Sequence, residues 1–249
     1  MIHRPECDML YAFFGERRGK MMSRLYSWFA ILGLGVVAAS ILMGFRHDPM
    51  APAINYAWNA AIFVGWMAVH YIMMTPGFKK AVFKAPQGSA AERRVYMTVS
   101  IVSWVAVYAF HLPMPGLAYV SPDWLVYFGL CAFLMSFLAF NEGATFEALK
   151  AFSGVAGTEM THGAAIDAPL MTKGSYASVR HPMYRGAMLM GLSSLLLHPN
   201  LAQFAWVMVI GMTFIAFIPL EEKQLLEGRG DEYRAYMEVT RYRVFKGIW

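Results

Sequence analysis

Apolar runs separated by short polar segments form the dominant pattern along the chain. A membrane-spanning helix needs about 20 mostly apolar residues. Four runs approach that length, namely Leu25–Gly44, Tyr56–Met74, Val95–Leu112 and Trp124–Phe140. Because a helix satisfies its own backbone hydrogen bonds in lipid, each of these runs is predicted to be a transmembrane helix.

Two further apolar runs lie close together towards the end of the chain. Gly186–Leu197 is short, and after the turn signal His198-Pro199-Asn200 the run Leu201–Leu220 is again of full length. We predict that they form a tight helical hairpin over 182–220, whose first arm begins near Pro182. The predicted fold is therefore an all-α, polytopic membrane helical bundle of about six spans.

The basic residues indicate how this bundle is oriented. Alternate polar segments carry 20 of the 21 Lys and Arg residues, and Arg46 is the exception. By the positive-inside rule, both the N- and the C-terminus are predicted to be cytoplasmic, in a multi-pass protein of a bacterial-type inner (cytoplasmic) membrane. Residues 1–24 then form a cytoplasmic N-terminal segment, 25–140 a four-span membrane region, and 141–249 a region with the hairpin and a cytoplasmic tail.

The composition agrees with a membrane protein and excludes several other classes. Hydrophobic residues make up 58% of the chain and charged residues 15%, against about 45–50% and about 25% in soluble domains. Two cysteines cannot build a disulfide scaffold. The net charge of +5 does not indicate nucleic acid, because the basic residues flank the apolar runs. No Gly-x-Gly-x-x-Gly motif follows a predicted strand and there is no P-loop, so a cofactor has to lie between the helices and the short polar segments.

Polar motifs gather on the predicted cytoplasmic side. In the stretch 174–186, Pro182 suits the first turn of a helix, so that Arg180 and His181 lie at its positive end, where backbone N–H groups can bind an anion. Glu221 and Glu222 follow the last span directly and could bind ribose hydroxyls or a cation. Simple alternatives are a helix cap with arginines that reach the lipid headgroups, and a solvated helix segment.

A third motif lies in the tail. Tyr233 and Tyr236 are three residues apart, so they share one face of a predicted helix. That face could fold back over the cytoplasmic mouth of the bundle. The alternative is a surface helix with interfacial tyrosines.

Together these motifs resemble the integral-membrane methyltransferases related to isoprenylcysteine carboxyl methyltransferase and the phospholipid methyltransferases. Their pattern is Gly-x-Tyr, Arg-His-Pro-x-Tyr-x-Gly, an apolar hairpin, Glu-Glu, and then Gly-x-x-Tyr-x-x-Tyr, and it is present in order from Gly174 to Tyr236. His70, near the end of the second span, and Glu92-Arg93-x-x-Tyr96 resemble more closely the NnrU-like and methanethiol S-methyltransferase-like branch.

This resemblance implies an S-adenosylmethionine-dependent methyltransferase that needs no metal, with 141–249 as the cofactor-binding region. The acceptor is expected to be small or lipophilic, a thiol ahead of a carboxylate or an amine, and to reach the cytoplasmic face through membrane lipid. The implied catalytic residues are Arg180, His181 and Arg241. The implied cofactor-binding residues are Tyr176, His181, Tyr184, Glu221, Glu222, Tyr233 and Tyr236.

The sequence departs from the prenyl-protein enzymes at two places. Phe217–Leu220 stands where those enzymes carry an arginine before Glu-Glu, and Val239-Thr240-Arg241 replaces Val-Pro-Arg. Both departures count against a prenyl-protein acceptor. Two other functions remain open at this point: an NnrU-like haem-binding redox or isomerase protein that uses His70 or His111, and a non-catalytic accessory subunit with partners in a membrane complex.

Overall fold

The computed structural model describes residues 25–26, 28–82, 90–143 and 170–249. The predicted N-terminal segment 1–24 and most of the stretch between the fourth and fifth apolar runs lie outside the described residues. Within the described part, every regular element is a helix and only two isolated β-bridges occur. The all-α prediction is therefore confirmed for this part of the chain.

The helices follow the predicted apolar runs. They are Trp28–Met43, α2 (Ile54–Met74), α3 (Pro76–Val82), α4 (Ala90–Phe110), α5 (Asp123–Gly143), the short 3-10 helix η1 (Gly174–Ala177), α7 (Pro182–Leu197), α8 (Leu201–Arg229) and α9 (Asp231–Val239). α8 continues well past the end of its apolar run at Leu220. It ends at Gly230, whose φ of +54° is a conformation that glycine adopts without steric cost. Glu221 and Glu222 are consequently held on a rigid helical extension.

Two of the described helices, α2 and α8, are long and apolar enough to cross a membrane. Their most apolar windows are only 33% and 39% buried. A core helix of a soluble protein would be mostly buried, so this exposure favours lipid as the surrounding solvent. Shorter apolar helices occupy Trp28–Met43, Arg94–Phe110 and Asp123–Ser136. The number of six spans and the orientation of the termini stay predictions.

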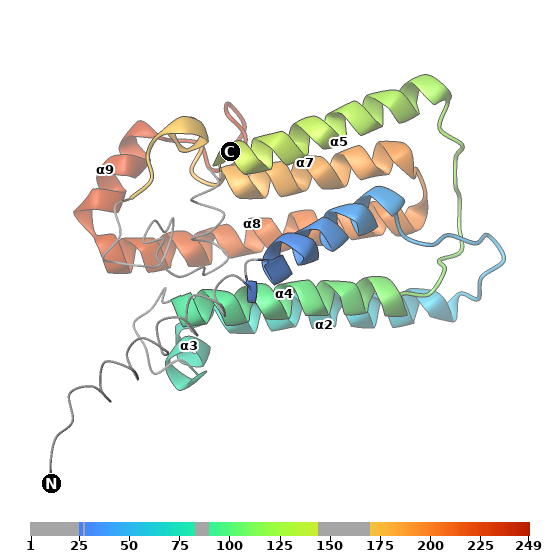
Figure 1. Cartoon of the computed structure of the whole chain (residues 1–249), viewed down its shortest axis with the longest axis horizontal. Coiled ribbons are helices and arrows are strands. Elements are labelled where there is room, and N and C mark those ends of the chain that lie inside the picture. Colours follow the sequence, from blue (N-terminus) through green and yellow to red (C-terminus); the bar gives the residue numbers. More distant parts are fainter. Residues whose placement is uncertain (1–24, 27, 83–89, 144–169) are drawn as a thin grey trace, which may run out of the picture.

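The long helices lie side by side, and the chain turns at the two ends of the bundle (Figure 1). One end carries the connections 44–53, 111–122 and 198–200. The other end carries α3, η1, α9 and residue 249. We call the second end the basic end, because the described segments rich in Lys and Arg meet there, whereas Arg46 lies at the opposite end.

Aromatic side chains form the core of the bundle. The rings of Trp104 and Trp206 are 4.4 Å apart between centroids, and Trp66 lies 5.4 Å from Trp206. Phe45 and Phe63 complete this cluster, which joins the Trp28–Met43 helix, α2, α4 and α8. The ring pairs are tilted or edge-to-face, the arrangements that aromatic quadrupoles favour.

Buried amide side chains close the end opposite the basic end. Asn59 on α2 accepts a hydrogen bond from the Leu112 amide at 2.9 Å and donates to the Leu112 carbonyl at 2.8 Å. Gln203 on α8 accepts from the Phe45 amide at 3.0 Å and donates to Ser194 Oγ on α7 at 2.6 Å. These bonds tie α2 to the connection 111–122, and α8 to the connection 44–53 and to α7.

Candidate functional site

An ion pair between Arg180 and Glu222 lies at the centre of the basic end. Arg180 precedes α7, Glu222 lies on the extension of α8, and Arg180 Nε donates to Glu222 Oε1 at 2.7 Å. The two residues are 5% and 3% exposed. A buried charge needs a partner, and each of these residues supplies the partner of the other.

The segment after α9 wraps around Arg180. The Nη1 group of Arg180 donates to the carbonyl oxygens of Thr240 and Arg241, at 2.8 and 2.7 Å. The amides of Arg180 and His181 donate to the carbonyls of Tyr242 and Arg243, at 2.9 and 2.8 Å. The sequence had suggested that backbone amides at this position bind an anion. The amides of Arg180 and His181 are not available for that purpose, because both already donate to backbone carbonyls. Pro182 begins α7 as predicted, and the side chain of the N-cap residue His181 makes no capping hydrogen bond to the first turn of that helix.

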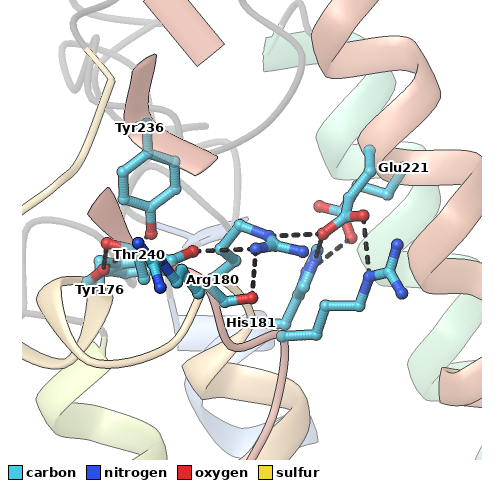
Figure 2. A network of polar contacts seen from close by, with 9 residues as sticks. Tyr176, Arg180, His181, Glu221, Tyr236 and Thr240 are labelled. Atoms are coloured by element: carbon cyan, nitrogen blue, oxygen red, sulfur yellow. Dashed lines mark hydrogen bonds and ion pairs between the residues drawn. The ribbon is translucent and has the colours of Figure 1, made fainter. Parts of the chain in front are cut away.

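His181 lies between the two adjacent carboxylates. Its Nε2 is 3.3 Å from Glu222 Oε1, and its Nδ1 is 3.5 Å from Glu221 Oε2. The Tyr184 hydroxyl donates to the same Glu221 oxygen at 2.8 Å, and the Tyr184 ring stacks on His181 with the centroids 5.4 Å apart. Figure 2 shows that Arg180, His181 and Glu221 belong to one network of polar contacts.

The charges in this network stabilise one another. Burial raises the pKa of the Glu222 carboxyl, but hydrogen bonds and charges from His181, Arg180 and Arg243 outweigh it and lower this pKa to about 2. Burial lowers the pKa of His181, and the hydrogen bonds and charges of Glu221 and Glu222 together outweigh that effect and raise it. His181 therefore favours the imidazolium form, which donates protons and cannot accept one.

Arg243 is the site residue that sequence reasoning missed. Its Nε donates to Glu222 Oε2 at 2.9 Å, and its guanidinium lies 5.1 Å from the centre of the Trp249 ring. Arg241, which the resemblance had implied as catalytic, has an exposed side chain, and among the described residues it meets the network through its backbone carbonyl. The sequence offers one hint of this role for Arg243, namely that it is a second arginine two positions after Arg241. Which arginine faces Glu222 depends on the turn that brings Trp249 back to Arg243.

The predicted tyrosines divide into two groups. The Tyr236 hydroxyl donates to the Tyr176 carbonyl at 2.8 Å, so its role here is to join α9 to η1. The Tyr233 hydroxyl is fully buried and has no hydrogen-bond partner among the residues that the structure describes. Burial raises the pKa of Tyr233, and the charges of Glu222 and Glu221 raise it further, so this hydroxyl lies within reach of their field.

The two histidines suggested for haem lie at different heights in the bundle. His111 Nε2 accepts from the Arg46 amide at 2.7 Å, close to where Asn59 bonds Leu112. His70 lies on α2, 11 residues beyond Asn59, which is about 16 Å along a helix. That separation opposes a joint site on one iron.

The folded state is expected to lose stability as the pH rises through the raised pKa of the His181 imidazole. The raised pKa of His181 means that its contribution is complete below the ordinary value of 6.5 and is lost as pH rises through the raised one. The contribution of Glu222 is present above the ordinary value of 4.5 and is lost only as pH falls towards about 2. Thermal unfolding midpoints in detergent, followed from weakly acidic to alkaline pH, should show the alkaline loss. His181→Asn should flatten it, and parallel curves for the two proteins would contradict the assignment.

A model of the phospholipid methyltransferase family matches residues 124–229. This segment covers most of α5 together with η1, α7 and α8. The match supports the membrane methyltransferase superfamily, while α9 and Arg243 lie beyond it. No curated protein matches the chain. The matched segment includes the site residues Tyr176, Arg180, His181, Tyr184, Glu221 and Glu222.

Proposed function

We propose that this chain is an integral-membrane methyltransferase that uses S-adenosylmethionine at the cytoplasmic face and acts on a small or lipophilic acceptor, a thiol ahead of a carboxylate or an amine. One observation carries the proposal. The buried cluster around Glu222, with Glu221 and His181 beside it, lies inside the segment that matches a methyltransferase family. Within this superfamily, we propose that the chain belongs to the NnrU-like branch, because His70, Glu92 and Tyr96 resemble residues of that branch.

The residues present fit such a cofactor. Tyr233 offers a buried hydroxyl with no partner among the described residues, a donor whose isolation costs about 1–3 kcal/mol until a ligand accepts from it. The first turn of α7, which the His181 side chain does not cap, suits a carboxylate. Glu221 suits the ribose hydroxyls or the sulfonium charge. The resemblance assigns the remaining cofactor contacts to the side chains of Tyr176, His181, Tyr184 and Tyr236.

Glu222 and Arg180 are better described as positioning residues. Both oxygens of Glu222 are engaged, one by Arg180 and His181 and the other by Arg243. Glu222 thereby holds three cationic groups in place instead of offering itself to a ligand. When bound, S-adenosylmethionine supplies an electrophilic methyl group for direct displacement, a reaction in which alignment is the main demand on the protein.

The bilayer explains how an apolar acceptor reaches the site. The carboxylates follow directly on the apolar run that ends at Leu220, so the site lies at the membrane edge. The concentration of Lys and Arg at the basic end supports a cytoplasmic orientation of that edge. A lipophilic acceptor in the inner leaflet would then meet the cofactor without crossing water.

Calorimetric titration of the detergent-purified protein with S-adenosylmethionine tests the proposal. We expect micromolar affinity. Tyr233→Phe should bind about tenfold more weakly, the equivalent of one lost hydrogen bond of about 1.4 kcal/mol, and should unfold at the same or a slightly higher temperature, because it removes an unsatisfied hydroxyl. Tyr242→Phe is the matched control, since among the described residues the Tyr242 hydroxyl makes no hydrogen bond.

Two outcomes would count against this function. Absence of binding in a well-folded protein would overturn it and favour the haem or the accessory-subunit function. Equal affinities of the wild type and Tyr233→Phe would show that the buried hydroxyl does not face the cofactor.

A further inference from the structure

His70 on α2 is a buried imidazole that the site described so far does not use. It is 6% exposed, and its Nδ1 lies 2.8 Å from the Trp66 carbonyl oxygen. A carbonyl oxygen only accepts hydrogen bonds, so Nδ1 carries the proton. Among the described residues no carboxylate pairs with His70, and a buried imidazole without such a partner favours the neutral form. Its Nε2 therefore presents a lone pair.

Contacts between α2 and α8 fix the height of His70 relative to the carboxylates. The rings of Tyr71 and Phe217 are 6.2 Å apart, and Gln224 Nε2 donates to the Met74 carbonyl at 2.8 Å. The two helices run in the same direction between these contacts, and Glu221 lies between Phe217 and Gln224. His70 is consequently about one helical turn, or about 5 Å, deeper in the bundle than Glu221.

The neighbours of His70 connect it to the site. The Tyr96 ring on α4 lies edge-on to the His70 ring, with the centroids 6.0 Å apart. Tyr96 lies within the electrostatic field of Glu221, whose carboxylate also accepts a hydrogen bond from the Tyr184 hydroxyl. The titratable groups around His70 are thus Tyr96 on α4 and, one turn further out, Glu221 on α8. The ring of Trp66 packs on His70 at 4.2 Å and supplies an apolar wall.

We propose that His70 is the catalytic base that takes the proton of the methyl acceptor, an inference that rests on the proposed function. His181 is unsuited to this role, because both of its ring nitrogens already face the carboxylates of Glu221 and Glu222. For a thiol acceptor, the S–H bond breaks and the proton passes to His70 Nε2. The sulfur lone pair forms the new S–CH₃ bond, and the electron pair of the broken C–S⁺ bond stays on the leaving sulfur as a neutral thioether. The imidazolium afterwards returns its proton to solvent.

This proposal places the acceptor on the side of α2 and α4. Both helices lie outside the segment that matches the phospholipid methyltransferase family. The cofactor would be bound by the matched segment, and the acceptor would be activated by the preceding part of the chain. His70 lies further into the bundle than Glu221. This position suits an acceptor that reaches the site from the lipid.

The test compares the wild type with His70→Gln, using 1-octanethiol as the probe acceptor. Affinity for S-adenosylmethionine, measured by calorimetry, should be equal in the two proteins. Turnover of octanethiol should fall by about 100-fold or more in the variant, which is the usual contribution of a general base. Added imidazole should restore part of it. His47→Gln is the control, since the described residues give the His47 ring no hydrogen bond and it lies at the opposite end of the bundle.

Two further readouts separate a base from a structural residue. The wild-type kcat/KM should be independent of pH between the pKa values of His70 and the thiol, whereas in His70→Gln it should rise about tenfold per pH unit, because only thiolate taken from solution reacts. In ¹⁵N-histidine spectra, the His70 signal should report the Nδ1–H tautomer. It should move towards imidazolium when octanethiol is added with S-adenosylhomocysteine.

The failures are distinguishable. Parallel pH profiles of the two proteins, or an unchanged His70 signal, would overturn the assignment of His70. So would a protein that binds S-adenosylmethionine but does not methylate octanethiol, and the proposed function would survive in each of these cases. A well-folded wild type that does not bind S-adenosylmethionine would overturn the proposed function itself.

Discussion

Replacing Glu222 by glutamine is expected to abolish measurable S-adenosylmethionine binding and to lower the thermal unfolding midpoint by several degrees. The carboxylate holds Arg180 and His181 through one oxygen and Arg243 through the other. Glutamine keeps one acceptor oxygen and presents an NH₂ group in place of the second, so a cationic donor then faces another donor. Breaking a buried ion pair on one side costs about 3–5 kcal/mol. We expect the lower end, because the Arg243 side chain is 31% exposed and can turn to water.

The matched control is Glu227→Gln on the same helix. Glu227 pairs with Lys223 at 3.9 Å, and its side chain is 62% exposed. A surface pair of this kind contributes about 0–1 kcal/mol, so both stability and binding should be unchanged. If Glu222→Gln bound the cofactor as tightly as the wild type, the cluster would be a structural clamp without a role in binding.

Helix positions could be predicted from the sequence because they depend on local pattern. The run Tyr56–Met74 became α2 at Ile54–Met74, and α7 begins at Pro182, where the missing N–H of proline costs nothing. The apolar run ends at Leu220, so the sequence did not predict that α8 continues to Arg229. Hydropathy marks the part of a helix that lies in lipid and does not indicate where the helix ends beyond it. The stop at Gly230 was visible only as one glycine among several.

The site could be predicted as a set of residues but not as a network. The pairing of Arg180, which precedes α7, with Glu222 on α8 joins residues 42 positions apart, which no local pattern specifies. The resemblance brought them together, and it said nothing of Arg243, whose direction depends on a turn at the end of the chain. The same limit applied to His181, which the resemblance implied as a catalytic residue without showing that its two ring nitrogens face Glu222 and Glu221.

A salt bridge beside the site shows how the two halves of the chain are joined. Lys79 on α3 lies 3.0 Å from Glu92 on α4, and its Nζ also donates to Gln224 on α8 at 3.4 Å. Gln224 in turn bonds the end of α2. The extension of α8 is thus held from one side by α2, α3 and α4 and from the other by the Arg180 network. A shift of α8 along its axis would break both sets of contacts, so the two halves keep the carboxylates at one height.

Arg180→Lys is expected to weaken S-adenosylmethionine binding about 100-fold and to release the segment that follows α9. The guanidinium donates to Glu222 and to the carbonyls of Thr240 and Arg241 at once. A lysine ammonium keeps the charge but is a point donor that cannot reproduce this fork. The unfolding midpoint should therefore fall less than in Glu222→Gln, while trypsin should cleave after Arg241 and Arg243 about tenfold faster. Calorimetry and timed proteolysis in detergent measure the two effects.

Arg234→Lys provides the control for this comparison, since Arg234 is 67% exposed and its one ion pair with a described residue is with Asp231 on the surface of α9, at 2.7 Å. It should leave binding and proteolysis unchanged. The two measurements also decide how Arg180 acts. If Arg180→Lys both loses binding and is cleaved faster, Arg180 holds the segment after α9 in place and thereby keeps Arg243 against Glu222. Loss of binding with an equally protected tail would contradict that role, because the guanidinium would then have to contact the cofactor itself.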